Sequence, residues 1–529
     1  MADATWWQRG VIYQIYPRSF MDSDGDGVGD LPGILARLDH LSWLGVDAVW
    51  LSPVHPSPMD DFGYDVSDYT GVDPVFGTLD DMDELVAAAH RRGLRVLLDW
   101  VPNHTSDRHL WFQESRASRD SPRRDWYIWR DPRPGGGPPS NWLRYAGDSA
   151  WRWDEGSGQF YYRVFLDSQP DLNWRNPEVQ EAMFGTLRFW LARGIDGFRI
   201  DALSVLVEDD RLRDNPPNPG YRPGRDLPYQ RELSVWNVDR PETRELAARM
   251  RKVVDEFGDD RVLLAEIGPL EQTVAYYGAQ GDGIQVPFNF ELLSVAWDAE
   301  GIAGAVGRYL AALPAGGWPN WVLGNHDTSR VASRVGPAQA RVAAMLLLTL
   351  PGTPILYYGD ELGLRDVPVP PEEALDPIAR LIPGRGRDPE RSPMPWDGGP
   401  GAGFTSGRPW LPLGADHRTL HVAAQRDDPG SMLTLHRRLL RLRRDAPALV
   451  GGGYEPVEAG GDVLAYRRDG PDGGYLVALN LGPRPARLAV PGPAPGRVLV
   501  STHPDRDGAP AGATLELRGD EGVVVGHGG

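Results

Sequence analysis

Eight short apolar segments recur along the chain, and each ends near polar residues. They span Val11–Tyr16, Asp47–Ser52, Arg95–Val101, Gly197–Asp201, Val262–Ile267, Gln285–Phe290, Trp321–Asp327 and Thr353–Gly359. Helical patterns such as Leu79–Arg92 and Pro177–Arg193 lie between most of them. Continuous apolar strands that alternate with helices indicate a parallel sheet covered on both faces. Because eight such strands close a barrel, we predict the α/β class and a (β/α)8 TIM barrel.

The spacing of these segments is uneven, which predicts additional domains. A long stretch after the third segment contains its own strand patterns and reads as an inserted small domain. Near the C-terminus, short alternating runs separated by Gly, Pro and Asp predict an antiparallel β-sandwich domain. We therefore divide the chain into barrel (1–101 and 174–455), inserted domain (102–173) and C-terminal β domain (456–529). Two irregular excursions, Leu203–Glu242 and Arg365–Leu411, follow the fourth and eighth segments.

Composition excludes several classes of function. The formal net charge of −19 repels nucleic acid and anionic membranes. No run of about 18 apolar residues occurs, so we expect no membrane span. The chain has no cysteine, which excludes disulfides, thiolate catalysis and cysteine-ligated zinc. The start, Met1–Gln8, lacks the basic and apolar parts of a secretory signal, so we expect a cytoplasmic protein.

Charged and hydrogen-bonding residues stand at the ends of four predicted strands. They are Asp99 with Asn103 and His104, Arg199 with Asp201, Glu266, and Asn325 with His326 and Asp327. A single strand-end carboxylate often only caps the next helix. Four strands that bring such residues to the C-terminal mouth of one barrel, where barrel enzymes carry their sites, favour a catalytic site. Buried charges otherwise cost stability unless they pair.

The strand order places Asp201 and Glu266 on neighbouring strands. Retaining glycosidases need two carboxyl groups about 5–5.5 Å apart, and adjacent strands are about 4.8 Å apart. The apolar residues Val262–Ala265 before Glu266 should raise its pKa, as an acid catalyst requires. Arg199 shares a strand face with Asp201 and should keep it ionised.

With these residues in place, the chain resembles glycoside hydrolase family 13, the α-amylase family, and most of all its α-glucosidase and oligo-1,6-glucosidase branch. Four short motifs match in order: Asp99–His104, Gly197–Asp201, Glu266 and Asn325–Asp327. The resemblance implies a retaining, exo-acting α-glucosidase that releases α-glucose from the non-reducing end of short α-glucosides.

The same resemblance assigns roles within the site. Asp201 is expected to be the nucleophile, Glu266 the general acid/base, and Asp327 the third carboxylate, which grips the sugar hydroxyls. His104, His326, Arg199 and Phe165 are expected to complete the substrate-binding set.

Two further segments resemble parts of the branch that close the sugar pocket. In the loop after the second segment, Tyr64 is expected to stack on the terminal glucose and Asp61 to bind its hydroxyls, with Asp60 the less favoured aspartate. Arg391, in preference to Arg387, is expected to pair with Asp61.

An acidic loop follows the first segment. Its residues Asp22, Asp24, Asp26, Val28 and Asp30 offer oxygen ligands at every second position, as in the start of a calcium loop. It is not an EF-hand, because Gly33 occupies the twelfth position. The branch carries a similar loop, so we expect a structural Ca²⁺ or Mg²⁺ here and no organic cofactor. The alternative is an unoccupied acidic turn.

Other functions stay open at this point. The same residues serve glucosyl transfer and the isomerisation of sucrose- or trehalose-type disaccharides, because only the acceptor differs. Ala202, beside the expected nucleophile, leaves the preferred linkage open. Metal-dependent hydrolysis is disfavoured by the absence of a His-x-His pattern, and a non-catalytic binding protein by the presence of all three carboxylates. The expected partner is a small sugar, with neither nucleic acid nor membrane, and the expected state is a monomer or homodimer.

Overall fold

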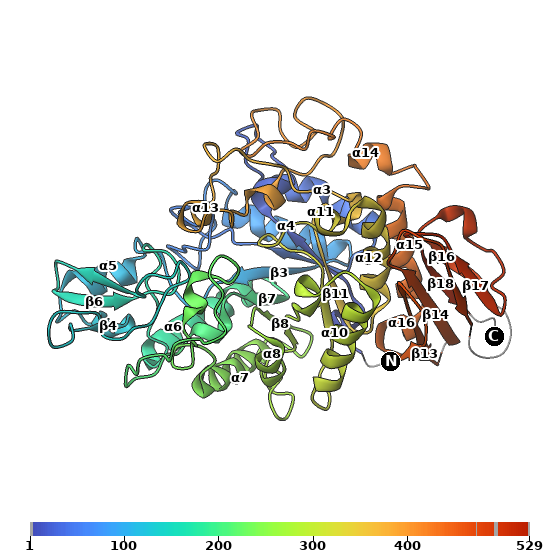
Figure 1. Ribbon diagram of the computed structural model, residues 1–529. Coiled ribbons are helices and arrows are strands. Elements are labelled where there is room, and N and C mark those ends of the chain that lie inside the picture. Colours follow the sequence, from blue (N-terminus) through green and yellow to red (C-terminus); the bar gives the residue numbers. More distant parts are fainter. Residues whose placement is uncertain (1–3, 472, 491–495, 527–529) are drawn as a thin grey trace.

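A computed structural model describes residues 4–471, 473–490 and 496–526 (Figure 1). Its centre is an eight-stranded parallel sheet in the order β10-β11-β1-β2-β3-β7-β8-β9. The strands are β1 (Ile12–Ile15), β2 (Ala48–Leu51), β3 (Arg95–Trp100), β7 (Gly197–Ile200), β8 (Val262–Ala265), β9 (Val286–Pro287), β10 (Asn320–Val322) and β11 (Thr353–Tyr357). Seven of them lie within a predicted segment, and β10 begins at Asn320, one residue before its predicted start at Trp321, so the predicted barrel is confirmed.

The side chain of Asn320 bridges the last gap of the barrel, between β9 and β10. Its amide nitrogen donates to the carbonyl of Pro287 at 2.5 Å, and its oxygen accepts from the backbone of Asn289 at 3.0 Å. These bonds satisfy strand-edge groups that would otherwise be buried without partners. The sheet is therefore nearly closed, and the ends of its strands face a common mouth.

Amphipathic helices cover the outer face of the barrel. Their starts follow ordinary rules: Thr78 caps α4, and proline occupies the first turn of α6, α7 and α12. The longer helices are α3 (Leu31–Leu44), α4 (Leu79–Arg91), α6 (Pro177–Ala192), α7 (Pro241–Asp255), α10 (Ala299–Ala312), α12 (Pro337–Thr349) and α15 (Met432–Asp445).

Between β3 and α6 the chain forms a small unit that projects to one side of the barrel (Figure 1). It contains α5 (Leu110–Ala117) and a three-stranded antiparallel sheet of β4 (Trp129–Arg130), β6 (Gln159–Tyr162) and β5 (Trp151–Asp154). An aromatic cluster that includes Trp142, Trp151 and Tyr162 forms its core. We propose that this unit is the inserted domain, with the boundaries 102 and 173.

The C-terminal part is antiparallel. One sheet contains β12 (Gly453–Val457), β13 (Val463–Gly470), β14 (Gly473–Asn480), β18 (Gly522–Gly526) and β16 (Arg497–Ser501), and a second pairs β15 (Ala486–Ala489) with β17 (Thr514–Leu517). Apolar residues from both sheets form a core between them. This is the predicted β-sandwich.

Across the described ranges, no helix combines the length and hydropathy that crossing a bilayer requires. Met1–Asp3, part of the start on which the prediction of no secretory signal rests, lie outside the described residues.

Candidate active site

A cavity of about 280 Å³ opens at the C-terminal ends of the barrel strands. Asp201 directly follows β7, Glu266 directly follows β8, and Asp327 lies just beyond β10, so all three predicted carboxylates line it. The structure also brings other predicted residues to this cavity: Asp61, Tyr64, His104 and Phe165. The mouth of the barrel thus gathers side chains that are far apart in the sequence.

Arg199 holds the two central carboxylates together. Its Nη1 donates to Asp201 at 2.7 Å, and its Nη2 donates to Glu266. The same Nη1 also donates to Asp99 at 3.0 Å, and the Arg199 side chain is only 2 % exposed. Both nitrogens belong to one guanidinium. The carboxylates of Asp201 and Glu266 therefore contact the same arginine head group and lie close together.

Burial raises the pKa of both Asp201 and Glu266 to about 7. Arg199 opposes this shift in both groups, whereas neighbouring carboxylates add to it. Arg199 lowers the pKa of Asp201, as predicted, but burial and the neighbouring carboxylates outweigh its effect. One guanidinium faces three carboxylates that are removed from water, so it does not offset the cost of charging them all. Near neutral pH the pair can share one proton.

Asp327 stands in a different electrostatic environment. Arg391 donates to it at 2.8 Å and Arg387 at 3.1 Å, while the ring of His326 lies 3.3 Å away. Although burial opposes the shift, these neighbours hold the pKa of Asp327 well below its ordinary value. Asp327 is therefore a permanently charged acceptor beside the Asp201–Glu266 pair.

The prediction that Arg391 pairs with Asp61 is wrong. Arg387 pairs with Asp61 at 2.7 Å, whereas Arg391 is 1 % exposed and donates to Asp327 and to the His326 carbonyl. The carboxylate of Asp376 explains the choice, because it accepts from both the backbone and the Nε of Arg387 and fixes that side chain. Of the two candidate aspartates, Asp61 lines the cavity.

Tyr64 lines the cavity and contacts His326 and His104. Its ring stacks on His326 with centroids 5.4 Å apart, and its hydroxyl lies 2.7 Å from His326 Nε2 and 3.0 Å from Asp99. Its backbone carbonyl lies 3.0 Å from His104 Nε2. The ring of Phe165 packs against the His104 ring, with the two ring centroids 5.2 Å apart. Burial lowers the pKa of His326 to about 3 and of His104 to about 4, so both rings are neutral.

Comparisons with known proteins place this geometry in a family. A family model described as the α-amylase catalytic domain matches residues 14–452. The chain belongs to the α-amylase family. A probable α-glucosidase of Rhizobium meliloti (strain 1021) is 43 % identical over 507 residues, covering 92 % of each chain. The α-amylase-family barrel, its carboxylates and such α-glucosidase relatives together make this chain a glycoside hydrolase.

Solved structures give the same family and a wider range of activities. The crystal structure of an α-glucosyl transfer enzyme is 44 % identical, with a TM-score of 0.93 over 99 % of this chain and 100 % of the other. The trehalulose synthase of Pseudomonas mesoacidophila MX-45 is 33 % identical, with a TM-score of 0.89 over 99 % of each chain. Both are proteins to which this chain is similar, and family membership alone does not distinguish between their activities.

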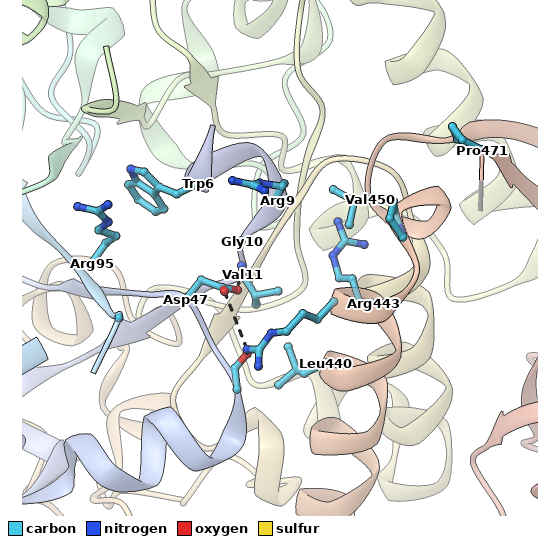
Figure 2. A pocket seen from close by; sticks show the side chains of 14 residues that line it. Trp6, Arg9, Gly10, Val11, Asp47, Arg95, Leu440, Arg443, Val450 and Pro471 are labelled. Atoms are coloured by element: carbon cyan, nitrogen blue, oxygen red, sulfur yellow. Dashed lines mark hydrogen bonds and ion pairs between the residues drawn. The ribbon is translucent and has the colours of Figure 1, made fainter. Parts of the chain in front are cut away.

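A larger cavity, of about 680 Å³, opens at the opposite end of the barrel (Figure 2). Residues at the starts of the strands, such as Val11, Asp47 and Arg95, line it. Among the described residues that line it, Asp47 is the sole carboxylate. Hydrolysis of a glycoside by this family's route needs two carboxyl groups, so the smaller cavity is the better candidate for the active site of the two.

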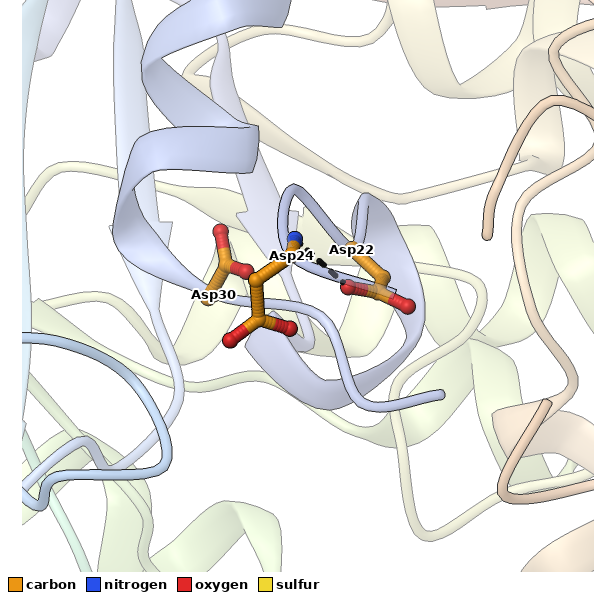
Figure 3. Close-up of side chains that lie close together, drawn as sticks. All are labelled: Asp22, Asp24 and Asp30. Atoms are coloured by element: carbon orange, nitrogen blue, oxygen red, sulfur yellow. Dashed lines mark hydrogen bonds between the residues drawn. The ribbon is translucent and has the colours of Figure 1, made fainter. Parts of the chain in front are cut away.

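Three of the predicted metal ligands lie together (Figure 3). The carboxylates of Asp22, Asp24 and Asp30 each place an oxygen within 4.8 Å of the others, a donor set that suits a hard cation. Asp26 falls outside this group, which contains side-chain ligands alone and so does not test the backbone carbonyl of Val28. The Asp22 carboxylate accepts backbone N–H bonds from Asp24, Gly25 and Gly27 and a hydroxyl bond from Thr405, and that of Asp30 accepts from Ser23 and Gly33.

Three buried side-chain oxygens were missed by the sequence analysis. In the described part of the chain, Asn103 Oδ1, Asp171 Oδ2 and Glu208 Oε1 are buried acceptors without a hydrogen-bond partner. Burial, with repulsion from Glu208, raises the pKa of Asp171, and burial raises the pKa of Glu208 to about 8. No sequence pattern could reveal them, because they come from three distant segments.

Gln14 and Trp50 are two further residues that the sequence analysis did not assign. Gln14 is fully buried and its Nε2 lies 2.8 Å from His326 Nδ1, while the Trp50 indole donates to Asp99 at 3.2 Å. A signal for Gln14 was present, since it is a polar residue within the apolar segment Val11–Tyr16. These side chains orient His326 and Asp99 and need not touch a substrate.

Proposed function

We propose that this glycoside hydrolase is a retaining, exo-acting α-glucosidase that releases α-glucose from short α-glucosides. The observation that carries the proposal is the pair Asp201 and Glu266, both bonded to Arg199 at the mouth of the barrel. Two carboxyl groups this close suit a double displacement, in which one attacks the sugar and the other transfers protons. The substrate is thus an α-glucoside of one or a few sugar units.

In the first step, Asp201 attacks the anomeric carbon while Glu266 gives its proton to the leaving oxygen. The exposures of the two side chains support this division, because Glu266 is 36 % exposed and Asp201 is 13 % exposed. Glu266 can therefore exchange protons with solvent, whereas Asp201 lies deeper. The form that reacts carries the shared proton on Glu266 and the charge on Asp201.

In the second step, Glu266 removes a proton from water, and the water oxygen displaces Asp201 from the anomeric carbon. Two displacements restore the α configuration. Asp327, which stays ionised, accepts hydrogen bonds from sugar hydroxyls. The neutral His104 lines the cavity beside it, and His326 positions Tyr64 through its Nε2. Tyr64 provides an aromatic surface for the ring.

The end of the cavity supports exo action. Asp61 and Arg387 form an ion pair there, and Gln169 donates to Asp61 at 3.1 Å. Arg387 also binds Asp327 and Asp376, so it connects the end of the cavity to the third carboxylate. A polymer could not extend past this group, whereas the non-reducing end of a short chain fits against it.

Glucosyl transfer and disaccharide isomerisation are the alternative. They use the same intermediate with a sugar acceptor in place of water. The similarity to an α-glucosyl transfer enzyme and to a trehalulose synthase is the observation that favours them.

We also propose that Asp22, Asp24 and Asp30 bind a structural Ca²⁺ or Mg²⁺. Asp24 supplies the ligand least engaged in backbone hydrogen bonds, since its carboxylate accepts only from Asp26 among the described residues. The cluster lies away from the reacting carboxylates, so an ion there would affect stability more than turnover.

Proton NMR of fresh product tests the proposed function. With maltose, isomaltose, sucrose, trehalose and kojibiose as separate substrates, the account predicts that α-glucose appears before mutarotation for at least one linkage. β-Glucose as the first product would exclude retention. Asp201→Asn should lose several orders of magnitude in turnover while its circular dichroism spectrum is unchanged.

A further inference from the structure

Four arginines line the cavity at the opposite end of the barrel from the active site (Figure 2). Arg9 ends α1 (Trp6–Arg9), Arg95 begins β3, and Arg443 and Arg444 lie in the last turn of α15. Asp47 supplies the single carboxylate among the described lining residues. Positive charge is therefore gathered at one place on a chain whose formal net charge is −19.

Two of these arginines have donors available to a ligand. The Arg9 side chain is exposed and forms neither a hydrogen bond nor an ion pair with any residue in the described ranges. Arg444 donates to the Gly45 carbonyl at 2.9 Å, and its distance of 4.0 Å from the Asp47 carboxylate is too long for a hydrogen bond. An anion in the cavity can therefore accept from both guanidiniums without breaking a hydrogen-bonded ion pair.

Arg443 is a buried cation without a carboxylate partner. It is 1 % exposed and forms no ion pair in the described part of the chain. Its Nε has no hydrogen-bond partner there, while its Nη atoms donate to the carbonyls of Leu348, Leu350, Gly352 and Leu449. Burial and repulsion by Arg468 lower the pKa of Arg443 to about 9, so it stays charged near neutral pH. Because buried arginines are ordinarily paired, an anion in the adjoining cavity would stabilise this one.

The carboxylate of Asp47 does not balance the charge around it. Burial raises the pKa of this carboxylate, and the charges of Arg444, Arg443 and Arg9 oppose that shift, so three guanidiniums act on one carboxylate. Arg95 is left out of this count, because it forms an ion pair of its own at 3.0 Å. Two positive charges thus stay unbalanced among the described lining residues. A phosphate monoester carries a charge of about −1.5 to −2 near pH 7, and guanidiniums bind phosphate oxygens well.

The cavity is larger than an inorganic ion requires. Its volume of about 680 Å³ lies in the range of sites for small organic ligands. Trp6 and Leu440 add apolar surface, and Figure 2 shows Trp6 on the side of Arg9 and Leu440 on the side of Arg443. An organic group attached to the phosphate would remove this apolar surface from water.

We propose that this cavity binds a phosphate monoester with an apolar organic group. The phosphate accepts hydrogen bonds from Arg9 and Arg444, and its charge compensates that of the buried Arg443. The organic group packs on Trp6 and Leu440. The ligand connects α1 and the starts of the barrel strands to α15, so it stabilises the fold and leaves the active-site cavity open. This inference does not depend on the proposed function.

Isothermal titration calorimetry with phenyl phosphate tests the proposal, in a phosphate-free buffer of low ionic strength. Inorganic phosphate and phenol represent the two parts of this probe. We expect one phenyl phosphate per chain, bound about tenfold or more tightly than inorganic phosphate, with phenol weaker than either. The Tm should rise with phenyl phosphate, because the ligand binds the folded chain. Equal affinity for phenyl phosphate and inorganic phosphate, or no binding of either, would overturn the proposal.

Two arginines of α15 provide matched variants. Arg444→Gln should weaken the binding of phenyl phosphate about tenfold or more, because a charged hydrogen bond is lost. Arg441→Gln is the control, since Arg441 lies in the same helix, is 85 % exposed and does not line the cavity. If Arg444→Gln does not fold, as judged by its Tm without ligand, Arg9→Gln replaces it. The same affinity in the cavity variant and the control would contradict the inference.

Asp47→Asn should change the affinity in the opposite direction. Asparagine keeps an acceptor for the backbone N–H of Val11, which donates to Asp47 at 2.9 Å, and removes the negative charge that repels the ligand. Phenyl phosphate should therefore bind this variant several-fold more tightly than the wild type. Arginines with a purely structural role predict no such gain, so unchanged or weaker binding would count against the site.

Enzyme kinetics distinguish this cavity from the active site. A saturating concentration of phenyl phosphate should leave kcat/KM for an α-glucoside unchanged, because the two cavities lie at opposite ends of the barrel. Competitive inhibition by phenyl phosphate would place it in the active-site cavity and overturn this inference, while the proposed function would stand.

Discussion

The Arg387 guanidinium meets the Asp61 carboxylate at 2.7 Å, although 326 positions separate the two residues in the chain. The pair closes one end of the active-site cavity, and the same guanidinium reaches Asp327 at 3.1 Å. A single arginine thus connects the wall of the sugar pocket to its permanently charged carboxylate. We therefore predict that Arg387 acts on substrate binding more than on the chemical step.

Replacing Arg387 with lysine tests that role. Lysine keeps the charge but not the planar set of donors that reaches several carboxylates at once. We expect KM for a short α-glucoside to rise about tenfold or more, with a smaller change in kcat, because charged hydrogen bonds contribute about 1.5–3 kcal/mol each. Arg365→Lys is the control, since Arg365 pairs with Asp416 on the surface. The same KM in both variants would rule out the role assigned to Arg387.

The raised pKa values of Asp201 and Glu266, both about 7, predict a bell-shaped pH dependence of kcat/KM. The reactive form carries one proton on the pair. Below this range Asp201 also binds a proton and cannot attack, and above it Glu266 loses the proton that the leaving group needs. The maximum should lie near neutral pH. A rate that still rises at pH 9 would contradict a protonated acid in this position.

Glu266→Gln isolates the alkaline side of that profile. With α-glucosyl fluoride, which needs no proton for departure of its leaving group, the first step of this variant should show no alkaline decline, whereas that of the wild type with maltose should show one. Glutamine does not titrate, so only Asp201 remains to set the pH dependence. An alkaline decline that persists in this variant would assign the titration to another group.

Asp201→Asn should stabilise the fold at high pH. Because the folded-state pKa of Asp201 lies above its ordinary value, ionising it costs folding free energy above about pH 7, and that cost is absent below about pH 4. Asparagine removes the cost. We expect the Tm of Asp201→Asn to exceed that of the wild type by a few degrees at pH 8, and the difference to vanish at pH 4. A lower Tm at pH 8 would show that the charge is stabilising there.

Chelation tests the acidic loop. If Asp22, Asp24 and Asp30 hold a divalent cation, EDTA should lower the Tm of the wild type while the turnover measured at 25 °C changes little. Asp24→Asn should abolish the effect of EDTA, since Asp24 is exposed and its loss leaves the backbone hydrogen bonds of Asp22 and Asp30 in place. The same EDTA shift in wild type and variant would place the ion elsewhere.

The barrel could be predicted because its strands are encoded locally. Segments such as Val262–Ile267 are continuous apolar runs, and a run buried on both faces has few alternatives to a central parallel strand. Asp201 and Glu266 could be found for the same reason, since each directly follows such a run. Once the strands are placed, the positions of the residues that directly follow them are placed as well.

The side chains of the long loops could not be predicted in this way. Arg391 and Arg387 lie four residues apart, and their choice of partner depends on Asp376, which fixes Arg387 from a neighbouring turn. The net pKa shift of Asp201 depends on the number of carboxylates around Arg199. These carboxylates come from different strands, so the sequence of one strand does not give their number. Pairing and burial across distant segments are properties of the folded chain.

In the proposed mechanism, Asp201 forms the bond to glucose and Glu266 carries the proton. Glu266→Gln incubated with α-glucosyl fluoride should accumulate the covalent intermediate, because the second step then lacks its base. Mass spectrometry of the intact protein should show the addition of one glucosyl group, and peptide mapping should place it on Asp201. A label on Asp327 or Asp99, or no label while β-glucose is released, would contradict the account.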